Sequence, residues 1–240
     1  MENTTPNAKK EKNVIYSLSP EANSFVFGDS FAFLVGVIAD FGVKADIAWK
    51  LPYLLKERLG DLSPKFLAKL PFKKIESAVC YPKPLHRFPK TTARYIWDSA
   101  AQVANEYNGD ASLIWNSDSA LEIKSKLIRF RGISHKKAYM MIKMLIRDWG
   151  LKVYDKDKVD LPYDVHNRRV LQRLGISKSD SMEEIWKAGR LLNPCYPAGF
   201  DDALWLIGRK HCHAQNPAHK QCPLRDVCVK TNIKATRKLD

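Results

Sequence analysis

The sequence predicts an all-α protein, and three observations support this prediction. Apolar residues recur at helical spacing in nearly every segment between the two ends of the chain. The period-two alternation that is typical of half-buried strands is nearly absent. Residues that favour helix ends, such as Asp29, Gly60 and Ser181, stand where the periodic segments begin or stop. No internal repeat of solenoid length is found, so a globular helical fold is expected.

The first half of the chain predicts a polar arm followed by three helices. Residues 1–13 are polar and charged, and they are expected to be disordered, as is the similar tail 230–240. Residues 29–41 are almost wholly apolar after Asp29 and Ser30, which predicts a buried helix. Residues 45–60 predict a helix that ends at Gly60, with Pro52 expected to kink or split it. An amphipathic helix is predicted over residues 91–109.

Two helices predicted in the middle of the chain enclose a short turn at residues 131–135. The first helix runs to about residue 130, and the second carries an apolar stripe that should face the core, formed by Ala138, Met141, Ile142, Leu145, Ile146 and Trp149. Lys136 points away from this stripe, at the N-terminus of the second helix. Free backbone N–H groups and the helix dipole make that end a phosphate site. Lys136 could therefore be a phosphate contact, a solvated charge or a nucleophile.

A polar connector at residues 149–162 leads to a further helix that begins after Asp164 and ends at Gly175. Asp164 is either the N-cap of that helix or a functional carboxylate. His166 and Arg169, on the same helix, could be structural hydrogen-bonding residues. Two more helices are predicted, over 181–194 with Ser181 and Glu184 in capping-box spacing, and over 197–210.

Four donors to soft metals lie close together near the end of the chain. Cys212, His219, Cys222 and Cys228 are separated by six, two and five residues. The chain has five cysteines, an odd number, and three of them lie within these 17 residues, which does not suggest a disulfide framework. In a reducing compartment such a group is more often a metal site. Three cysteines and one histidine suit either an iron–sulfur cluster or zinc.

The charge balance indicates an anionic partner. Forty Lys and Arg against 26 Asp and Glu give a net charge of +14, and nucleic acid is the partner that such a charge favours most. A highly soluble surface is the alternative reading. The first 13 residues have no apolar core of a secretory signal, and no stretch approaches the ~20 apolar residues of a membrane span. An intracellular protein without a membrane partner is expected.

Taken together, these segments resemble the helix-hairpin-helix DNA glycosylases, and in particular the endonuclease III branch. The hairpin of that family reads Leu-Pro-Gly-Val-Gly-Arg-Lys-Thr-Ala, and residues 130–138 match it as Phe-Arg-Gly-Ile-Ser-His-Lys-Lys-Ala. The resemblance puts the family's catalytic lysine on Lys136. The family motif Val-Asp-x-His-x-x-Arg-Val matches residues 163–170 and puts its catalytic aspartate on Asp164. It implies DNA contacts from the hairpin residues Gly132, Ser134, His135 and Lys137.

The same resemblance implies a fold of two helical lobes. A six-helix bundle with the helix-hairpin-helix would span residues 40–149, and residues 14–39 with 150–240 would form a lobe with the metal-cluster loop. The implied function is base-excision repair by a monomeric DNA glycosylase with AP lyase activity. Such an enzyme flips a damaged, oxidised base out of double-stranded DNA, or binds an abasic site, and nicks the strand through a lysine Schiff base. The terminal loop would hold a [4Fe-4S] cluster.

Several departures from the family pattern keep alternatives open. Ser134 replaces the second hairpin glycine. Lys136 and Asp164 are 28 positions apart, which is longer than expected for endonuclease III and closer to the spacing of the archaeal 8-oxoguanine glycosylases. Polar residues that endonuclease III brings to the flipped base fall near Phe41 and Val43. The alternatives are an 8-oxoguanine-specific enzyme, a monofunctional enzyme that uses Asp164 and water, a non-catalytic DNA-binding protein and a zinc-only adaptor that binds protein.

The remaining predictions concern the pocket beside the flipped base and the metal ligands of the terminal loop. Phe41, Lys44 and Tyr163 are the expected pocket or wedge residues beside the flipped base. In the terminal loop, His219 stands where the family has a cysteine. The [4Fe-4S] cluster, zinc and a loop without metal therefore all remain possible readings of the four donors.

Overall fold

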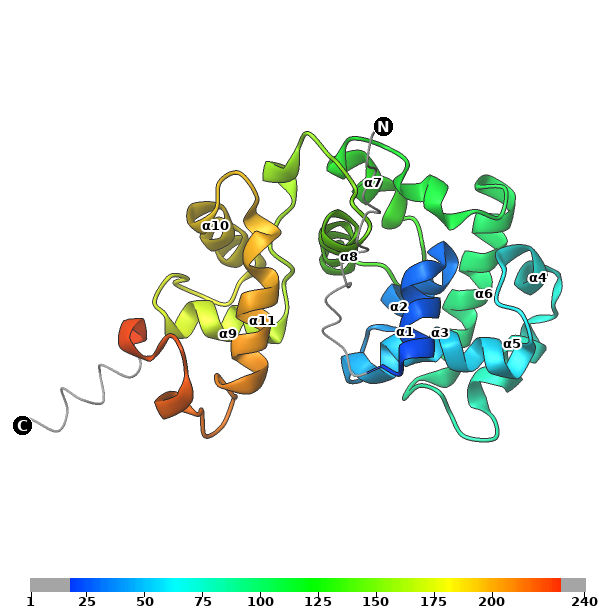
Figure 1. Cartoon of the computed structure of the whole chain (residues 1–240), viewed down its shortest axis with the longest axis horizontal. Helices are drawn as coiled ribbons and strands as arrows, with labels where there is room; N and C mark the ends of the chain where they lie inside the picture. Colours follow the sequence, from blue (N-terminus) through cyan, green and yellow to red (C-terminus); the bar gives the residue numbers. More distant parts are fainter. Residues whose placement is uncertain (1–17, 230–240) are drawn as a thin grey trace, which may run out of the picture.

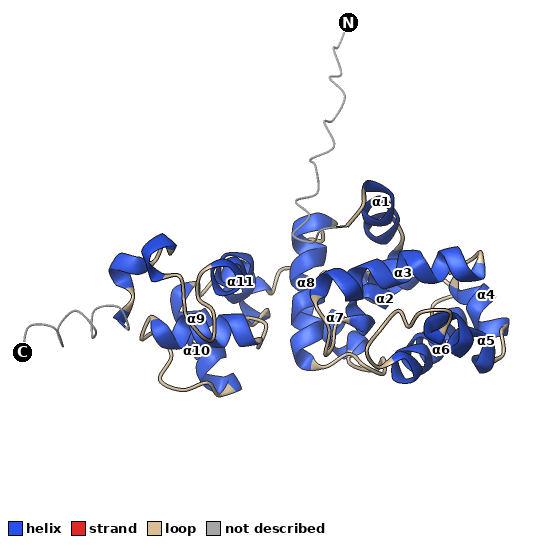
Figure 2. Ribbon diagram, turned by 90° about the horizontal axis from the view of Figure 1, so that it is seen from below, coloured by secondary structure: helices blue, strands red, loops and turns tan. Residues whose placement is uncertain are grey.

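The computed structural model describes residues 18–229, and every regular element within that range is helical (Figure 2). The predicted arm 1–13 and the tail 230–240 lie outside the described residues. Two lobes lie side by side (Figure 1). The large lobe contains α1 (Pro20–Gly28), α2 (Ser30–Ala39), α3 (Ala45–Leu59), α4 (Pro64–Lys69), α5 (Phe72–Cys80), α6 (Pro89–Glu106), α7 (Ala120–Leu127) and α8 (His135–Asp148). The small lobe contains α9 (Val165–Arg173), α10 (Met182–Leu192), α11 (Asp201–Lys210) and the C-terminal loop, residues 212–228.

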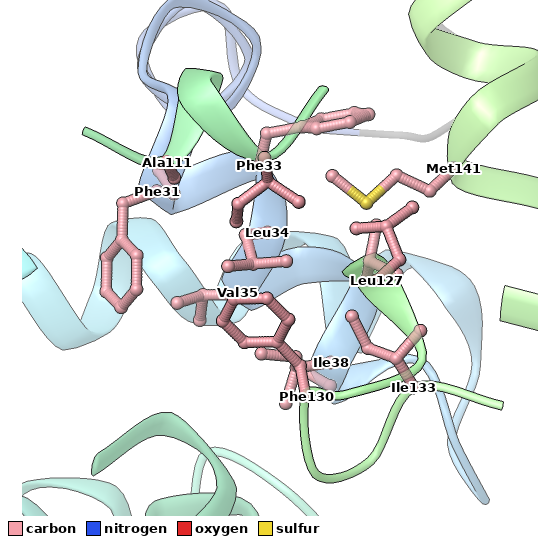
Figure 3. Close-up of a cluster of buried hydrophobic side chains, with 14 of the residues drawn as sticks. Phe31, Phe33, Leu34, Val35, Ile38, Ala111, Leu127, Phe130, Ile133 and Met141 are labelled. Atoms are coloured by element: carbon pink, nitrogen blue, oxygen red, sulfur yellow. The ribbon is translucent and has the colours of Figure 1, made fainter. Parts of the chain in front are cut away.

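Helix α2 is the centre of the large lobe. Its sequence is apolar on every side, and all of its residues from Phe31 to Ala39 are buried. Side chains from the hairpin and from α8 pack around it, as Figure 3 shows for Phe130, Ile133 and Met141. The side chain of Asp29 caps the helix by accepting from the N–H of Ala32 at 2.7 Å. The predicted buried helix is confirmed.

Helices α1 and α2 pack with the large lobe. Both contact α3, and α2 also contacts α6 and α8. Figure 1 shows them beside α3, on the far side of α8 from the small lobe. This differs from the predicted grouping of residues 14–39 with residues 150–240, because the apolar faces of these helices are buried in the core that α3 and α8 share. The helices α3 to α8 do fall within the predicted bundle 40–149.

The small lobe has its own core, which Leu161, Val170, Leu171, Ile185, Ala188 and Leu204 form. Helices α9 and α11 pack closely in it because Gly208 of α11 lies against His166 of α9. A Cβ atom on residue 208 would lie 2.5 Å from the Cβ atom of His166. Any side chain at Gly208 would therefore push α9 and α11 apart.

Most predicted helix ends agree with the structure to within a few residues. Ser181 accepts a hydrogen bond from the N–H of Glu184 and caps α10, and Gly60 ends α3 with a φ of 83°. Helix α3 continues through Pro52 without being split. The helices α1, α4 and α5 were not individually predicted. All three are short, and Pro20 and Pro64 open α1 and α4.

No single helix of residues 18–229 is long and apolar enough to cross a membrane. Helices α1 and α2 reach the required length and composition only as a pair, with a bend of 105° between them. The buried position of α2 in the large lobe accounts for its apolar sequence.

Candidate active site

A cleft of about 1070 Å³ opens between the two lobes, and both predicted catalytic residues line it. Lys136 comes from the first turn of α8 in the large lobe, and Asp164 stands at the start of α9 in the small lobe. Charged side chains of both signs share the cleft walls, among them Asp40, Arg87 and Arg209. The two residues that the sequence motifs single out therefore face one space across the lobe boundary.

The hairpin before α8 fixes where Lys136 lies. Gly132 has a φ of +89°, and a Cβ atom there would lie 2.6 Å from the ring of Tyr95, so glycine is required. Ser134 caps α8, with its hydroxyl oxygen 3.5 Å from the N–H of Lys137. Ser134 and His135 are exposed, which suits their predicted role as DNA contacts. Among residues 18–229, Lys136 forms no hydrogen bond or ion pair.

Lys137 is not a surface contact, which corrects the prediction for this residue. Its side chain is buried, and its ammonium donates to the carbonyl oxygens of Ile38 and Gly132, both at 2.8 Å. It also lies over the ring of Phe41, with Nζ 4.9 Å from the ring centre. Burial lowers the pKa of Lys137 to about 8. This lysine fastens the hairpin to the end of α2.

Asp164 is both a helix cap and a cleft residue. Its Oδ1 accepts from the N–H groups of His166 at 2.6 Å and Asn167 at 2.9 Å. Burial, and then the negative charge of Asp201, raise the pKa of Asp164 to about 6. The N–H groups and the positive charge of Lys136 act in the opposite direction. A carboxylate whose pKa lies near neutrality and that faces a lysine is typical of an acid–base site.

The three predicted pocket or wedge residues have different positions. Lys44 and Tyr163 line the cleft. The hydroxyl of Tyr163 donates to the carbonyl of Asp180 at 2.8 Å, so this ring is held at the rim. Phe41 is not among the cleft residues, because its ring packs against His86 and Phe88 beside the end of α2. The structure therefore brings two of the three to the cleft.

Asp40 is a cleft residue that the motifs did not single out. It ends α2, and its carboxyl group forms no hydrogen bond among residues 18–229. Burial raises the pKa of Asp40, while the charges of Lys136, Lys137 and His86 lower it. The signal in the sequence was weak, because Asp40 is simply the first polar residue after an apolar helix.

The four predicted metal ligands of the C-terminal loop do not fit one metal ion. Across residues 18–229, no three His, Cys, Asp or Glu side chains lie together as a metal site requires. The sulfur of Cys212 accepts from Nη1 of Arg173 at 3.3 Å, and the thiol of Cys228 donates to the carbonyl of Arg173 at 3.5 Å. A zinc ion would need all four ligands directed at one point, whereas a [4Fe-4S] cluster would need each ligand to reach a separate iron of the cluster. The arrangement does not fit a single zinc ion, and no chemical step is assigned to a metal.

Two arginines of α9 hold the start of the C-terminal loop. Arg173 donates to the carbonyl oxygens of His213 at 2.7 Å and Ala214 at 3.1 Å, in addition to the sulfur of Cys212. Arg169 donates to the carbonyl of Cys212 at 2.5 Å and to that of Gly208 at 3.1 Å. The guanidinium groups thereby satisfy carbonyl oxygens in the last turn of α11 and beyond its end.

The structure thus has two helical lobes, and Lys136 after the hairpin and the helix-capping Asp164 line the cleft between them. No family model and no curated protein matches the chain. Solved structures do match it, and they confirm the resemblance at the level of the fold.

Three of these structures show how far the similarity reaches. An endonuclease III trapped as a covalent intermediate with DNA is 19% identical, with a TM-score of 0.63, over 91% of this chain and 99% of that one. A thermostable thymine-DNA glycosylase is 15% identical, with a TM-score of 0.63, over 85% of each chain. The 8-oxoguanine glycosylase/lyase of Clostridium acetobutylicum is 15% identical, with a TM-score of 0.57, over 80% of this chain and 66% of that one.

Proposed function

We propose that this protein is a base-excision DNA glycosylase that acts on double-stranded DNA carrying a damaged base. The observation that carries the proposal is the position of Lys136 and Asp164, which come from different lobes and line one cleft. Chains of the same fold include endonuclease III, thymine-DNA glycosylase and 8-oxoguanine glycosylase. The cleft volume of about 1070 Å³ is ample for one extruded nucleotide.

The charge and the hairpin support DNA binding. A net charge of +14 gives sequence-independent affinity for phosphates through the release of counterions. The exposed start of α8, at Ser134 and His135, offers backbone N–H groups to a phosphate. Extruding a nucleotide costs a few kcal/mol, and the cost is lowest for a damaged or mismatched base. Selection for damage therefore begins before any contact to the base itself.

The chemistry that we propose starts at Asp164. As the base departs from C1′ with the bonding electron pair, positive charge develops on the sugar. The carboxylate of Asp164 stabilises this charge, and it accepts the proton that the ammonium of Lys136 must lose before its nitrogen can attack. The raised pKa of Asp164, about 6, leaves this group ionised and still basic near neutral pH.

A lyase step follows if the neutral amine of Lys136 attacks C1′. Once the new C–N bond has formed, the C1′–O4′ bond breaks, O4′ takes a proton to become the 4′ hydroxyl, and C1′ and the lysine nitrogen are left joined as a protonated Schiff base. Loss of a proton from C2′ then expels the 3′ phosphate by β-elimination and nicks the strand. Alternatively, water guided by Asp164 replaces the lysine as nucleophile, and the product is an intact strand with an abasic site.

The proposal is tested with a panel of duplexes that contain thymine glycol, 8-oxoguanine, uracil, an alkylated base or an abasic site. We expect base release from at least one of them. Borohydride should trap a covalent complex if Lys136 forms a Schiff base, and Lys136→Ala should abolish that complex and the nick. The matched control is Lys136→Arg, which keeps the charge and DNA affinity but cannot form a Schiff base.

The possible outcomes separate the candidate functions. Trapping that persists in Lys136→Ala would show that another amine is the nucleophile. Abasic sites that accumulate without nicks would identify a monofunctional glycosylase. Salt-sensitive DNA binding with no base released from any duplex would identify a non-catalytic DNA-binding protein. Absence of both binding and cleavage would reject the proposal as a whole.

A further inference from the structure

A largely buried ionic network joins the two lobes at the wall of the cleft. The ammonium of Lys143, on α8, lies 2.6 Å from Oδ2 of Asp201 and 2.5 Å from Oδ1 of Asp202, both in the first turn of α11. The side chains of Lys143 and Asp201 are each only 7% exposed. Arg147, one turn further along α8, pairs with the second oxygen of Asp202 at 2.5 Å. The network therefore links the large lobe to the small lobe.

The network reaches Asp164 through one residue. Oδ1 of Asp201 accepts from the side-chain amide of Asn167 at 2.6 Å, and the same amide donates to the carbonyl of Pro162 at 2.9 Å. The backbone N–H of Asn167 donates to Oδ1 of Asp164. Asn167 is completely buried. Asp201 is thus two hydrogen bonds from Asp164, and Asn167 is fixed from both sides.

The network also reaches Lys136, because Lys143 lies on the same face of α8. Lys136, Met140 and Lys143 follow the spacing i, i+4, i+7, and all three line the cleft. A rigid helix of 14 residues therefore fixes the distance between Lys136 and Lys143. The position of Asp164 relative to Lys136 then depends on the geometry of the ion pair between Lys143 and Asp201.

Stability alone does not account for such a pair. Removing two charges from water costs about as much as their attraction returns, so a buried ion pair is weak evidence of a stabilising role. The pair lies where the two lobes meet and is connected to both candidate catalytic residues. A small displacement between reacting groups costs far more in rate than in stability.

We propose that Lys143 and Asp201 are positioning residues that hold Asp164 in register with Lys136 across the lobe boundary. The inference rests on the proposed function, because it concerns the same reaction. Neither residue contacts the expected reacting atoms. Each acts through another residue, Asp201 through Asn167 and Lys143 through Asp201.

The charges around Asp164 give this proposal a distinctive signature. Asp201 faces Asp164 from α11 and raises its pKa, after burial, while Lys136 from α8 and the N–H groups of α9 lower it. Asp202 and Arg209 of α11 and Asp40 at the end of α2 line the same cleft. Burial would raise the pKa of Asp202, but the charges of Lys143 and Arg147 together lower it. Removing the charge of Asp201 should therefore lower the pKa of Asp164.

The test is the pH profile of single-turnover base release from whichever duplex the wild type cleaves. In Asp201→Asn we expect the rate constant to fall about tenfold or more, as for a displaced catalytic group. The acidic limb of the profile should also move to lower pH. Lys143→Met should slow the reaction and move the limb to higher pH, because the negative charge of Asp201 is then unopposed. Lys143→Arg, which keeps the charge, should leave the limb unchanged and retain more activity than Lys143→Met.

The matched control is Asp160→Asn, which breaks an ion pair outside the cleft at a carboxylate that is as buried as that of Asp201, although its partner Arg190 is 58% exposed. Asp160 is 2% exposed and pairs with Arg190 at 2.8 Å. This variant should lose stability and leave the acidic limb unmoved.

A loss of rate without a limb shift in Asp201→Asn would reduce the pair to a structural role and overturn the proposal. If Asp201→Asn fails to fold, the pH profiles of Lys143→Met and Lys143→Arg test the proposal instead. Acidic limbs at the same pH in these two variants would overturn it. A wild type that releases no base overturns the proposed function instead.

Discussion

The cleft and the C-terminal loop differ in whether the structure brings their candidate functional residues together. In the cleft, Lys136 and Asp164 come from different lobes, and rigid helices bring them to one space. In the loop, Cys212, His219, Cys222 and Cys228 lie within 17 residues, yet they do not converge. Closeness in the sequence therefore predicts a shared site less well than the secondary structure that positions each residue. The cleft residues stand at helix N-termini, whereas the loop residues stand on short turns between α11 and the end of the described chain.

The largest effect is expected on the cleft side of this comparison. Asp164→Asn should lower turnover by about 100-fold or more, the usual contribution of a general base, because the amide cannot accept a proton or stabilise positive charge. Asparagine caps helices as well as aspartate does, so α9 should remain intact. Single-turnover rates and DNA affinity are the measurements. The control is Ser181→Ala, which removes the cap of α10 outside the cleft and should leave the rate unchanged. Normal turnover in Asp164→Asn would reduce Asp164 to a cap.

The same substitution should have the opposite effect on stability. A carboxyl group with a raised pKa in the folded state contributes stability that is complete below its unfolded pKa, and this contribution is lost as the pH rises through about 6. Wild type should therefore be less stable than Asp164→Asn above about pH 7, by about 3 kcal/mol at most, and the difference should shrink towards about pH 4.

Urea unfolding at about pH 4.5 and about pH 8 measures that difference. The control is Asp226→Asn, at a side chain that is 86% exposed, where a change within about 0.5 kcal/mol is expected at both pH values. A wild type as stable as Asp164→Asn at the higher pH would show that the cleft does not hold Asp164 at a raised pKa.

A smaller effect is expected from Arg173 on the loop side. Arg173→Ala removes the donors to the sulfur of Cys212 and to the carbonyl oxygens of His213 and Ala214. We expect the free energy of unfolding to fall by about 2 kcal/mol, as for lost hydrogen bonds to a charged donor. The control is Arg225→Ala, at an exposed arginine whose salt bridge is to Asp226. Equal stability of the two variants would show that Arg173 does not hold the loop.

The smallest effect is expected from a cysteine that the metal hypothesis requires. Cys222→Ser should change the free energy of unfolding by less than about 0.5 kcal/mol, because Cys222 is only partly buried and its side chain forms no hydrogen bond among residues 18–229. Treatment of the wild type with a chelator should likewise leave its unfolding curve unchanged. Absorption near 400 nm that Cys222→Ser abolishes would support the iron–sulfur prediction, and a loss of stability on chelation would support a bound metal. Either result would show that the four donors of the loop do form one site, as the cleft residues do.

The sequence predicted the parts of this molecule that local rules govern. The buried helix α2, the capped starts of α9 and α10 and the all-α class all follow from periodicity and capping residues within one segment. Residues that depend on contacts between segments were harder to predict. In the sequence Lys137 looks like its neighbour Lys136, which is only partly buried, and the contact of Lys137 with Ile38, 99 positions away, cannot be predicted from local rules. Asp201 and Lys143 are likewise paired by tertiary structure alone.

The placement of α1 and α2 was missed for a similar reason. The apolar sequence of a helix predicts that the helix is buried, but it does not predict in which lobe. The metal ligands illustrate the converse case. Their spacing is a property of the sequence, but coordination requires four side chains to point inward, and the hydrogen bonds of Arg173 to this loop are not visible in any spacing.

Helix α2, which is buried from Phe31 to Ala39, is followed directly by the cleft residue Asp40, so this part of the cleft wall, its floor, adjoins the interior of the large lobe. A substitution in that floor must also preserve the packing around nine consecutive buried residues. The rim, in contrast, is formed by surface positions such as Lys44 and Ile47, which tolerate exchange at little cost in stability. Evolution or engineering of a new base preference should therefore proceed by remodelling the rim while the floor stays constant.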